Sequence, residues 1–173
     1  IAYPLVMKAS SSRILHKSER GLVKIDSRDA EEAEAAFEEL RASMEEEKGA
    51  VLVQEMIRGR RELMVGLTRD PQFGPCVMFG LGGVMAELFE DSVFAVAPLT
   101  HEEALKLIGR IRGRKMLDGF RGAPPVDREE LARILVTLGE IGLSQPRIRE
   151  IDINPLIIGE EGAAAVDATI ILG

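Results

Sequence analysis

The chain has 173 residues, of which 46% are hydrophobic and 29% are charged, with 17 glycines and 8 prolines. These proportions are those of a globular protein of one domain or two lobes, and they exclude wholesale disorder and fibrous repeats. The net charge of −7 argues against nucleic-acid binding, which depends on neutralising phosphates. No apolar run approaches the roughly 20 residues of a membrane helix, and the single Cys76 fits a reducing compartment. We therefore predict a cytoplasmic protein with no membrane or nucleic-acid partner.

The first third of the chain predicts two strands, a helix and a third strand. Residues 4–9 and 22–25 are short apolar runs that are typical of buried strands. Asp29 precedes a glutamate by three positions, which is the spacing of a capping box, so we expect a helix to begin here and to close at residues 48–49. Residues 51–54 form the next strand. Apolar residues recur in this helix at spacings of three and four, so they share one face, which is predicted to be buried. They are Ala30, Ala33, Phe37, Leu40 and Met44.

The middle of the chain predicts a hairpin followed by two helices. The strands 62–68 and 75–79 flank a turn that contains proline, glycine and aspartate. Thr100 and Asp127 each precede a glutamate by three positions, so each is expected to begin a helix, the first running through residue 111. Because helices and strands alternate along the chain, the pattern predicts an α/β or α+β fold.

Two basic positions near the N-terminus are candidates for phosphate chemistry. Lys8 ends an apolar strand, where it either extends to water or acts as a fixed cation for a phosphate. His16 is followed by Lys17 and Ser18 in a loop whose N–H groups and side chains can hold an anion. An imidazole at that place can act as a base or accept a phosphoryl group, although a lone surface histidine is more often inert. His101 is interpreted as a surface residue.

Two further segments follow predicted strands and can approach a ligand. Gln54, Glu55, Met56 and Ile57 combine polar and apolar groups at a strand end, where backbone N–H and C=O groups suit an adenine edge. Residues 80–83, Gly-Leu-Gly-Gly, permit a close backbone approach to a ligand or form a plain tight turn. Neither the dinucleotide fingerprint nor the Walker phosphate loop fits this sequence.

An acidic constellation lies near the C-terminus. A predicted strand over 148–153 carries Glu150 and Asp152 on one face, and alternation places Asn154 on the same face. Asp167 follows a second apolar strand that can pair beside the first. Carboxylate and amide oxygens, with phosphates completing the shell, are ligands that Mg²⁺ prefers. The alternative is an exposed charged strand face that ends in an Asn-Pro turn.

Taken in order, these segments resemble the ATP-grasp β part of ADP-forming acyl-CoA synthetases, which are acetate–CoA ligases related to succinyl-CoA synthetase. The resemblance is carried by residues 3–8, 14–19, 53–56, 66–75, 78–83, 117–122, 150–155 and 166–168. It implies an ATP-grasp fold of two lobes with the nucleotide between them. Residues 1–56 would be the remainder of the small lobe, with its N-terminal part expected to be missing, and 57–173 the larger lobe with the Mg²⁺-binding strands.

The resemblance also implies a role for each candidate residue. Nucleotide contacts are expected from Lys8 on the phosphates, the adenine hinge of Gln54, Glu55, Met56 and Ile57, and Glu62 near the ribose or hinge. Asn154 and Asp167 match the Mg²⁺ ligands. His16 matches a histidine that relays a phosphoryl group to ADP, and Asp152 matches an acidic residue near the phosphorylated histidine.

The implied function is the nucleotide-binding half of an ADP-forming acid–thiol ligase. Such a part transfers a phosphoryl group between a phosphohistidine and ADP or ATP with Mg²⁺, and it couples this to the interconversion of an acid and CoA with the acyl-CoA. The partner would be a CoA-binding α subunit or fused domain, in a homo- or hetero-oligomer, so the chain by itself would be incomplete.

Two alternatives stay open. One is a synthetase-like regulatory or scaffold region of a multidomain protein lysine acetyltransferase, which Ala95 favours slightly because the synthetases commonly have an arginine there that could contact phosphate. Leu22 is a second departure, since the family usually has two adjacent glycines where this chain has Gly21 and Leu22. The other alternative is a carboxylate–amine ligase, against which the His16 loop argues.

Overall fold

The computed structural model describes residues 1–10, 21–44, 49–119, 122 and 124–173, which divide into two compact units, residues 1–56 and 57–173. All strand pairings among these residues are antiparallel. Helices and strands both occur in the chain, so the fold is of mixed α and β type, as predicted. Within the same residues, no helix has the length and apolar character needed to cross a membrane.

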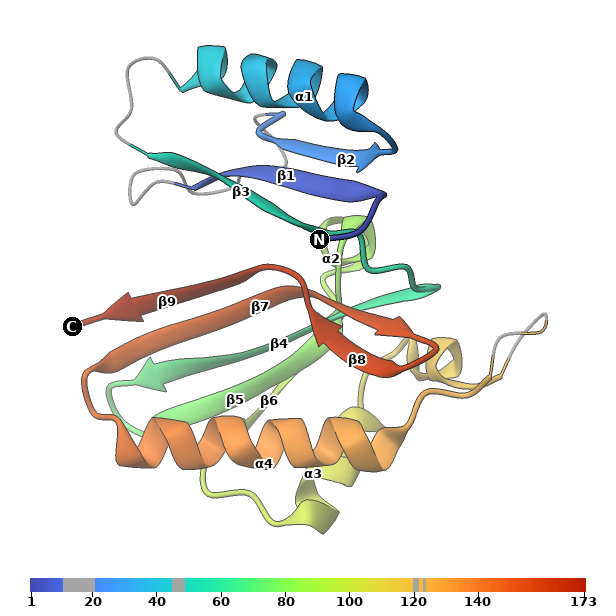
Figure 1. Cartoon of the computed structure of the whole chain (residues 1–173). Coiled ribbons are helices and arrows are strands. Elements are labelled where there is room, and N and C mark those ends of the chain that lie inside the picture. The colour runs from blue at the N-terminus through green and yellow to red at the C-terminus, as the bar shows by residue number, and fades with distance from the viewer. Residues whose placement is uncertain (11–20, 45–48, 120–121, 123) are drawn as a thin grey trace. The chain divides into compact units, whose positions relative to one another are not determined.

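The N-terminal unit is a three-stranded sheet that carries one helix. Its elements are β1 (Leu5–Ser10), β2 (Val23–Ser27), α1 (Ala30–Ser43) and β3 (Ala50–Glu55). The sheet order is β2-β1-β3, and α1 packs on one face of the sheet (Figure 1). The three predicted strands and the helix start are therefore confirmed.

The buried face of α1 is narrower than predicted. Asp29 accepts a hydrogen bond from the N–H of Glu32 at 2.9 Å, which satisfies a free donor of the first turn. Leu40 and Met44 are buried, but Phe37 is 38% exposed and Ala30 is also exposed. A small sheet covers only a narrow stripe of a helix, so the predicted positions at the edge of the stripe remain in solvent. The helix also ends at Ser43, earlier than predicted.

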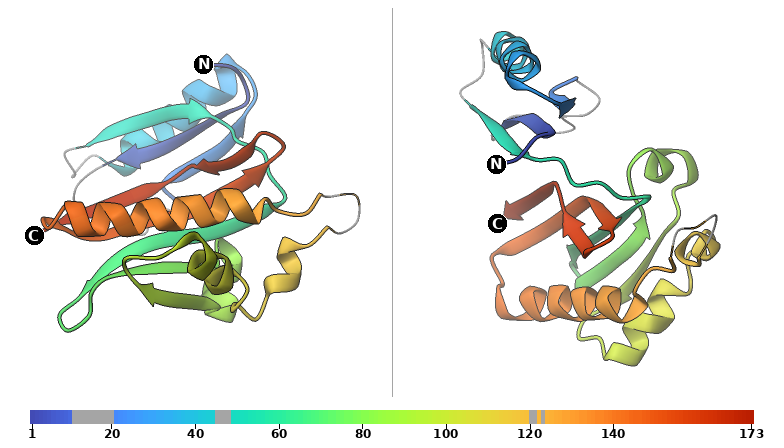
Figure 2. Two further views of the ribbon diagram at one scale, coloured as in Figure 1. Left: turned by 90° about the horizontal axis from the view of Figure 1, so that it is seen from below. Right: turned by 45° about the vertical axis from the view of Figure 1, so that its right-hand side comes forward.

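The C-terminal unit is a six-stranded sheet with helices on one face. Its elements are β4 (Arg61–Asp70), β5 (Gly74–Leu81), α2 (Val84–Phe89), β6 (Ser92–Val96), α3 (His101–Ile108), the 3₁₀ turn η1 (Arg114–Leu117), α4 (Arg128–Ser144), β7 (Ile148–Gly159), β8 (Gly162–Ala165) and β9 (Ala168–Leu172). The strand order is β6-β5-β4-β7-β8, and β9 also pairs with β7. Both α4 and α3 lie on the same side of this sheet (Figures 1 and 2).

Alternation along the strands separates a packed face from an open face. Leu63, Val65 and Leu67 of β4 are buried in one core with Leu131 and Leu135 of α4. The intervening residues of β4 point to the opposite face, because successive strand side chains alternate. The predicted hairpin and both helix starts are confirmed, although α3 ends at Ile108 rather than beyond it.

The Asn-Pro pair does not end a strand. The strand predicted to end at Ile153 continues through Asn154 and Pro155 to Gly159. Proline lacks an N–H and is tolerated inside a strand only at a bulge or an edge. Such a bulge is present here, since the register between β4 and β7 shifts at this point.

Candidate functional site

Asn154 lies at a bulge of β7. The partners of Ile153 and Leu156 on β4 are two positions apart, so Asn154 and Pro155 together stand opposite Met64. A bulge redirects the side chains of its strand and is frequent beside active sites. The open face of β7 therefore carries an amide at the point where the strand bends.

The strand pairing brings Asp167 beside Asn154. On β9, Ala168 pairs with Ile153, and β8 continues the same register on the other side of the bulge. Asn154 and Asp167, which lie between the two paired segments, are therefore neighbours across the strands, and both are half-buried. Asp167 also accepts a hydrogen bond from the N–H of Ala168 at 3.1 Å. The strand register thus brings two residues with oxygen-bearing side chains to neighbouring positions.

The glycine turn after β5 packs against the same place. The N–H of Gly83 donates to Oδ1 of Asn154 at 3.0 Å, and the N–H of Gly82 donates to the carbonyl of Glu62 at 2.9 Å. A Cβ atom on Gly83 would lie 1.7 Å from Oε2 of Glu62. The two glycines therefore permit a close approach of the turn to β4 of this chain. The structure thus brings the predicted residues Glu62 and Asn154 both close to Gly83.

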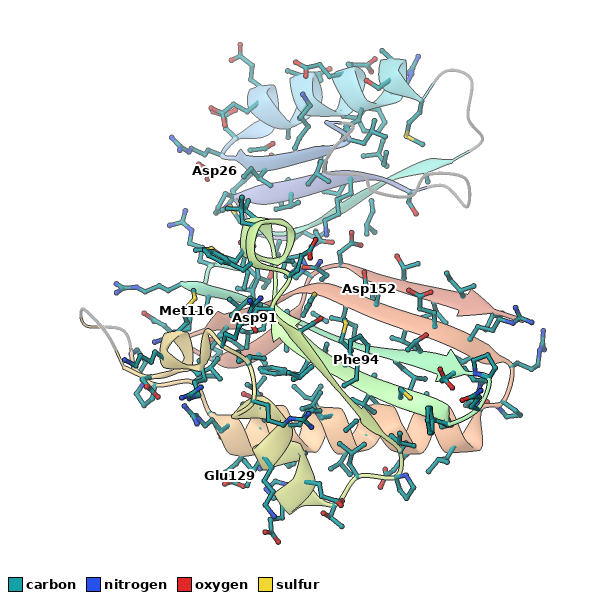
Figure 3. The ribbon with its side chains drawn as sticks, turned by 180° about the vertical axis from the view of Figure 1, so that it is seen from behind. Asp26, Asp91, Phe94, Met116, Glu129 and Asp152 are labelled. Carbon is teal, nitrogen blue, oxygen red and sulfur yellow. The ribbon has the colours of Figure 1, made fainter. Side chains whose placement is uncertain are left out.

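Asp152 lies in a shallow hollow on the open face of the sheet. This hollow has a volume of about 230 Å³, and its lining includes Thr68, Met78, Phe94 and Glu150. Figure 3 labels Asp152 and Phe94 on this sheet. Glu150 and Asp152 share one face of β7, as the alternation predicted. Thr68 and Phe94 were not among the predicted site residues, since only the pairing of β4, β5 and β6 with β7 places them here.

The predicted adenine hinge has one backbone donor already in use. The N–H of Met56 donates to the carbonyl of Pro4 at 3.0 Å, which extends the ladder between β1 and β3. In an antiparallel pair, the residues that bond to the partner alternate with residues whose backbone groups point away. The N–H and C=O of Glu55 are therefore directed to the outer edge of β3, the edge strand of its sheet. Within this hinge, Glu55 is better placed than Met56 to contact a ligand edge.

The other residues singled out from the sequence are Lys8, His16 and Ala95. Lys8 is only 5% exposed on β1, so the alternative in which it extends to water is wrong. His16 lies outside the described residues. Ala95 packs against the main core with its side chain on the helix-covered side of the sheet, so the difference there does not affect the open face.

A buried carboxylate holds the segment that follows α2. Asp91 accepts hydrogen bonds from the N–H groups of Arg112 and Gly113 at 2.8 and 2.6 Å. Burial raises the pKa of Asp91, but these two donors and the Arg112 guanidinium together lower it by more, so the pKa lies below its usual value. The same residue accepts at its carbonyl from the N–H of Leu81. Asp91 thus fixes both ends of the segment that carries the glycine turn.

The donor set at the bulge fits Mg²⁺ better than a soft metal. Among the described residues, no group of three or more His, Cys, Asp or Glu side chains could hold a metal ion. Asn154 and Asp167 instead offer one amide and one carboxylate, both hard oxygen donors. Mg²⁺ is commonly held by one or two carboxylates, with water and substrate phosphates filling the other positions. This arrangement is therefore suited to a metal that arrives with a phosphorylated ligand.

Known proteins of the ATP-grasp domain family are similar to this chain over nearly its whole length. The ATP-grasp domain family matches residues 1–172. The β subunit of the ADP-forming acetate–CoA ligase I of Pyrococcus furiosus is 47% identical over 99% of this chain and 76% of its own length. The ADP-forming acetate–CoA ligase I of Archaeoglobus fulgidus is 39% identical, and this chain spans 26% of its length.

One archaeal protein with solved structures is also closely similar. It is the dinucleotide-forming acetyl-coenzyme A synthetase 1 of Ca. Korarchaeum cryptofilum, in a complex with coenzyme A and Ca-AMPCP. The TM-score is 0.93 at 43% identity, and the match covers 100% of this chain and 78% of that chain. A second structure of that synthetase contains coenzyme A and Mg-AMPPCP, with a phosphohistidine segment pointing towards the nucleotide binding site. Its TM-score is 0.86 at 44% identity, with the same coverage.

Proposed function

Since this chain belongs to the ATP-grasp domain family, of the β-subunit type found in ADP-forming acetate–CoA ligases, we propose that it binds ADP or ATP with Mg²⁺ and supports phosphoryl transfer to and from the nucleotide. The observation that carries the proposal is the position of Asn154 at the β7 bulge and of Asp167 between β8 and β9, which the register of the flanking pairs places opposite each other. The amide is carried by β7, and the carboxylate lies on the short link between two strands that both pair with β7, so the backbone positions of both oxygen donors are defined by the sheet. Rigid support is what phosphoryl transfer requires, because its catalysis is mostly positioning and charge neutralisation.

Each candidate residue has a proposed role in binding the nucleotide and its Mg²⁺. Lys8 contributes a cation to the nucleotide phosphates, and the outward backbone groups of Glu55 contact the adenine edge. Asn154 and Asp167 hold Mg²⁺, which neutralises phosphate charge when it is bound. The burial of Lys8 supports its part, since a lysine on a strand with little freedom is a fixed point charge.

The transfer itself exchanges one bond for another. The N–P bond of a phosphohistidine whose other ring nitrogen is protonated breaks while a β-phosphate oxygen of ADP forms the new O–P bond, and that ring proton stays on the leaving group, which gives a neutral imidazole and ATP. His16 is proposed to relay the phosphoryl group, and Asp152 to orient the phosphorylated imidazole. The position of Asp152 on the open face, beside Glu150 and Thr68, supports an approach from that side.

The proposed partner is a CoA-binding α subunit or domain that forms the acyl phosphate. This part of the proposal is supported by the β-subunit relative of Pyrococcus furiosus and by the phosphohistidine segment in the synthetase of Ca. Korarchaeum cryptofilum. The division of residues 1–56 and 57–173 into the two nucleotide-holding lobes stays a prediction. A cytoplasmic location and an oligomeric assembly also stay predictions.

Calorimetric titration of Mg-ADP into the chain tests the nucleotide site. We expect binding that weakens when Mg²⁺ is removed with a chelator, and Asp167→Ala should lose this dependence on Mg²⁺. Asp118→Ala is the matched control, because it removes the same charge from an exposed pair with Arg128 at 2.8 Å. Absence of nucleotide binding by a folded chain, or equal behaviour of the two variants, would contradict the proposal.

A further inference from the structure

Gly83 occupies a backbone conformation that only glycine adopts easily. Its φ is +57° and its ψ is −145°, in a region where a Cβ atom is strongly disfavoured. Space is limiting as well, since an added Cβ would meet the carboxylate of Glu62. Two independent constraints, backbone angle and packing, thus require glycine here. In this conformation the N–H of Gly83 contacts Asn154 of β7.

The N–H of Gly83 determines which way the Asn154 amide faces. The oxygen and nitrogen of an asparagine amide are otherwise assigned from their partners. A backbone N–H can only donate, so the atom that faces it at 3.0 Å is the oxygen Oδ1. This oxygen keeps a second lone pair for a cation, and Nδ2 is directed elsewhere as a donor. Gly83 therefore selects one of two amide orientations before any ligand binds.

The neighbouring glycine of the turn, Gly82, makes a different contact from Gly83. Gly82 donates its N–H to the carbonyl of Glu62, which fastens the turn to β4. Of these two glycines, it is Gly83 whose N–H reaches across to β7. The bond from Gly82 still ties the turn to β4 when the contact between Gly83 and Asn154 is lost, although a Cβ at Gly83 must also displace the carboxylate of Glu62.

We propose that Gly83 is a positioning residue that acts through Asn154: its N–H holds the amide oxygen in the orientation that binds the cation. This inference rests on the proposed function, because Asn154 as a cation ligand is part of that proposal. Groups that orient a metal ligand commonly change metal affinity by about 10- to 100-fold when they are lost. The effect should appear in cation affinity and should require Asn154.

The experiment measures Mn²⁺ binding to the chain in the presence of ADP, by electron paramagnetic resonance of the free ion. Gly83→Ala should weaken Mn²⁺ binding by about tenfold. Gly74→Ala is the matched control: Gly74 also has a positive φ, +77°, lies at the other end of β5 and has no atoms near an added Cβ. The control should lose stability from backbone strain but keep its Mn²⁺ affinity.

The combination with Asn154→Ala separates positioning from general damage. In that background Gly83→Ala should cause no further loss of Mn²⁺ affinity, because the ligand on which it acts is gone. A loss that persists in the double variant, or an equal loss in Gly74→Ala, would overturn the inference while leaving the nucleotide site intact. A wild-type chain that binds no Mn-ADP would overturn the proposed function together with the inference.

A second measurement covers the case in which Gly83→Ala does not fold. Hydrogen exchange of the Gly83 amide in the metal-free chain should be slow, fast in Asn154→Ala and slow again in Asn154→Asp, whose carboxylate can accept the same bond. Equal exchange in all three chains would refute the contact.

Discussion

Replacing Asp91 by alanine should destabilise the C-terminal unit strongly. The carboxylate is 4% exposed, and it accepts from two backbone N–H groups, those of Arg112 and Gly113. An unsatisfied buried donor costs about 1–3 kcal/mol. Because the two hydrogen bonds of Asp91 are only partly buried, each is expected near the lower part of that range, about 1–2 kcal/mol, which predicts a loss of about 2–4 kcal/mol in the free energy of unfolding. The ion pair with the exposed Arg112 guanidinium at 3.6 Å adds little, because water screens it.

Urea denaturation followed by far-ultraviolet circular dichroism measures this loss, since the chain has no tryptophan for fluorescence. With a slope of about 2 kcal/mol per molar urea, the midpoint should fall by about 1–2 M. Hydrogen exchange at Arg112 and Gly113 should accelerate at the same time. Asp118→Ala, which removes an exposed carboxylate, should change the midpoint little. An unchanged midpoint with both amides still protected in Asp91→Ala would refute the reasoning.

Three other outcomes follow from the same contacts. The pKa of Asp91 is lowered in the folded chain, so its carboxylate stabilises the fold above the unfolded pKa of about 3.9, and this stabilisation is lost as the pH falls through the folded pKa. In urea titrations at several pH values, Asp91→Asn should therefore show a smaller loss of unfolding free energy at acid pH than the unchanged chain does. Leu40→Ala should cost about 2–5 kcal/mol of unfolding free energy, and Phe37→Ala about 1 kcal/mol or less, because Leu40 is fully buried and Phe37 is not; equal losses in urea denaturation would contradict this. The Arg69 guanidinium donates to the carbonyls of Gly142 and Ile148 at 2.7 and 3.2 Å, so Arg69→Ala should lower stability by about 1.5–3 kcal/mol in thermal melts, with Arg69→Lys recovering only part of it.

Local signals in the sequence were sufficient for most elements. Asp29, Thr100 and Asp127 begin helices because a side-chain oxygen satisfies a free N–H within three residues, a contact that sequence spacing alone specifies. The helix α2 was not predicted. It has only six residues, and Val84 and Leu88 are exposed, so the usual link between an apolar side chain and a buried face is absent.

In the candidate site too, local sequence identifies the residue types, whereas contacts between distant segments determine how they are arranged. The sequence by itself determined which residues can supply oxygen donors, since Asn154 and Asp167 are chemically suited to Mg²⁺ wherever they lie. Only the tertiary structure decided that they are neighbours, because this depends on the register of β7 with β8 and β9 and on a bulge that the Asn-Pro pair did not reveal. It also decided that Gly83 contacts Asn154, 71 positions away. Contacts at that separation depend on how strands pair, and no pattern within a few residues encodes the pairing.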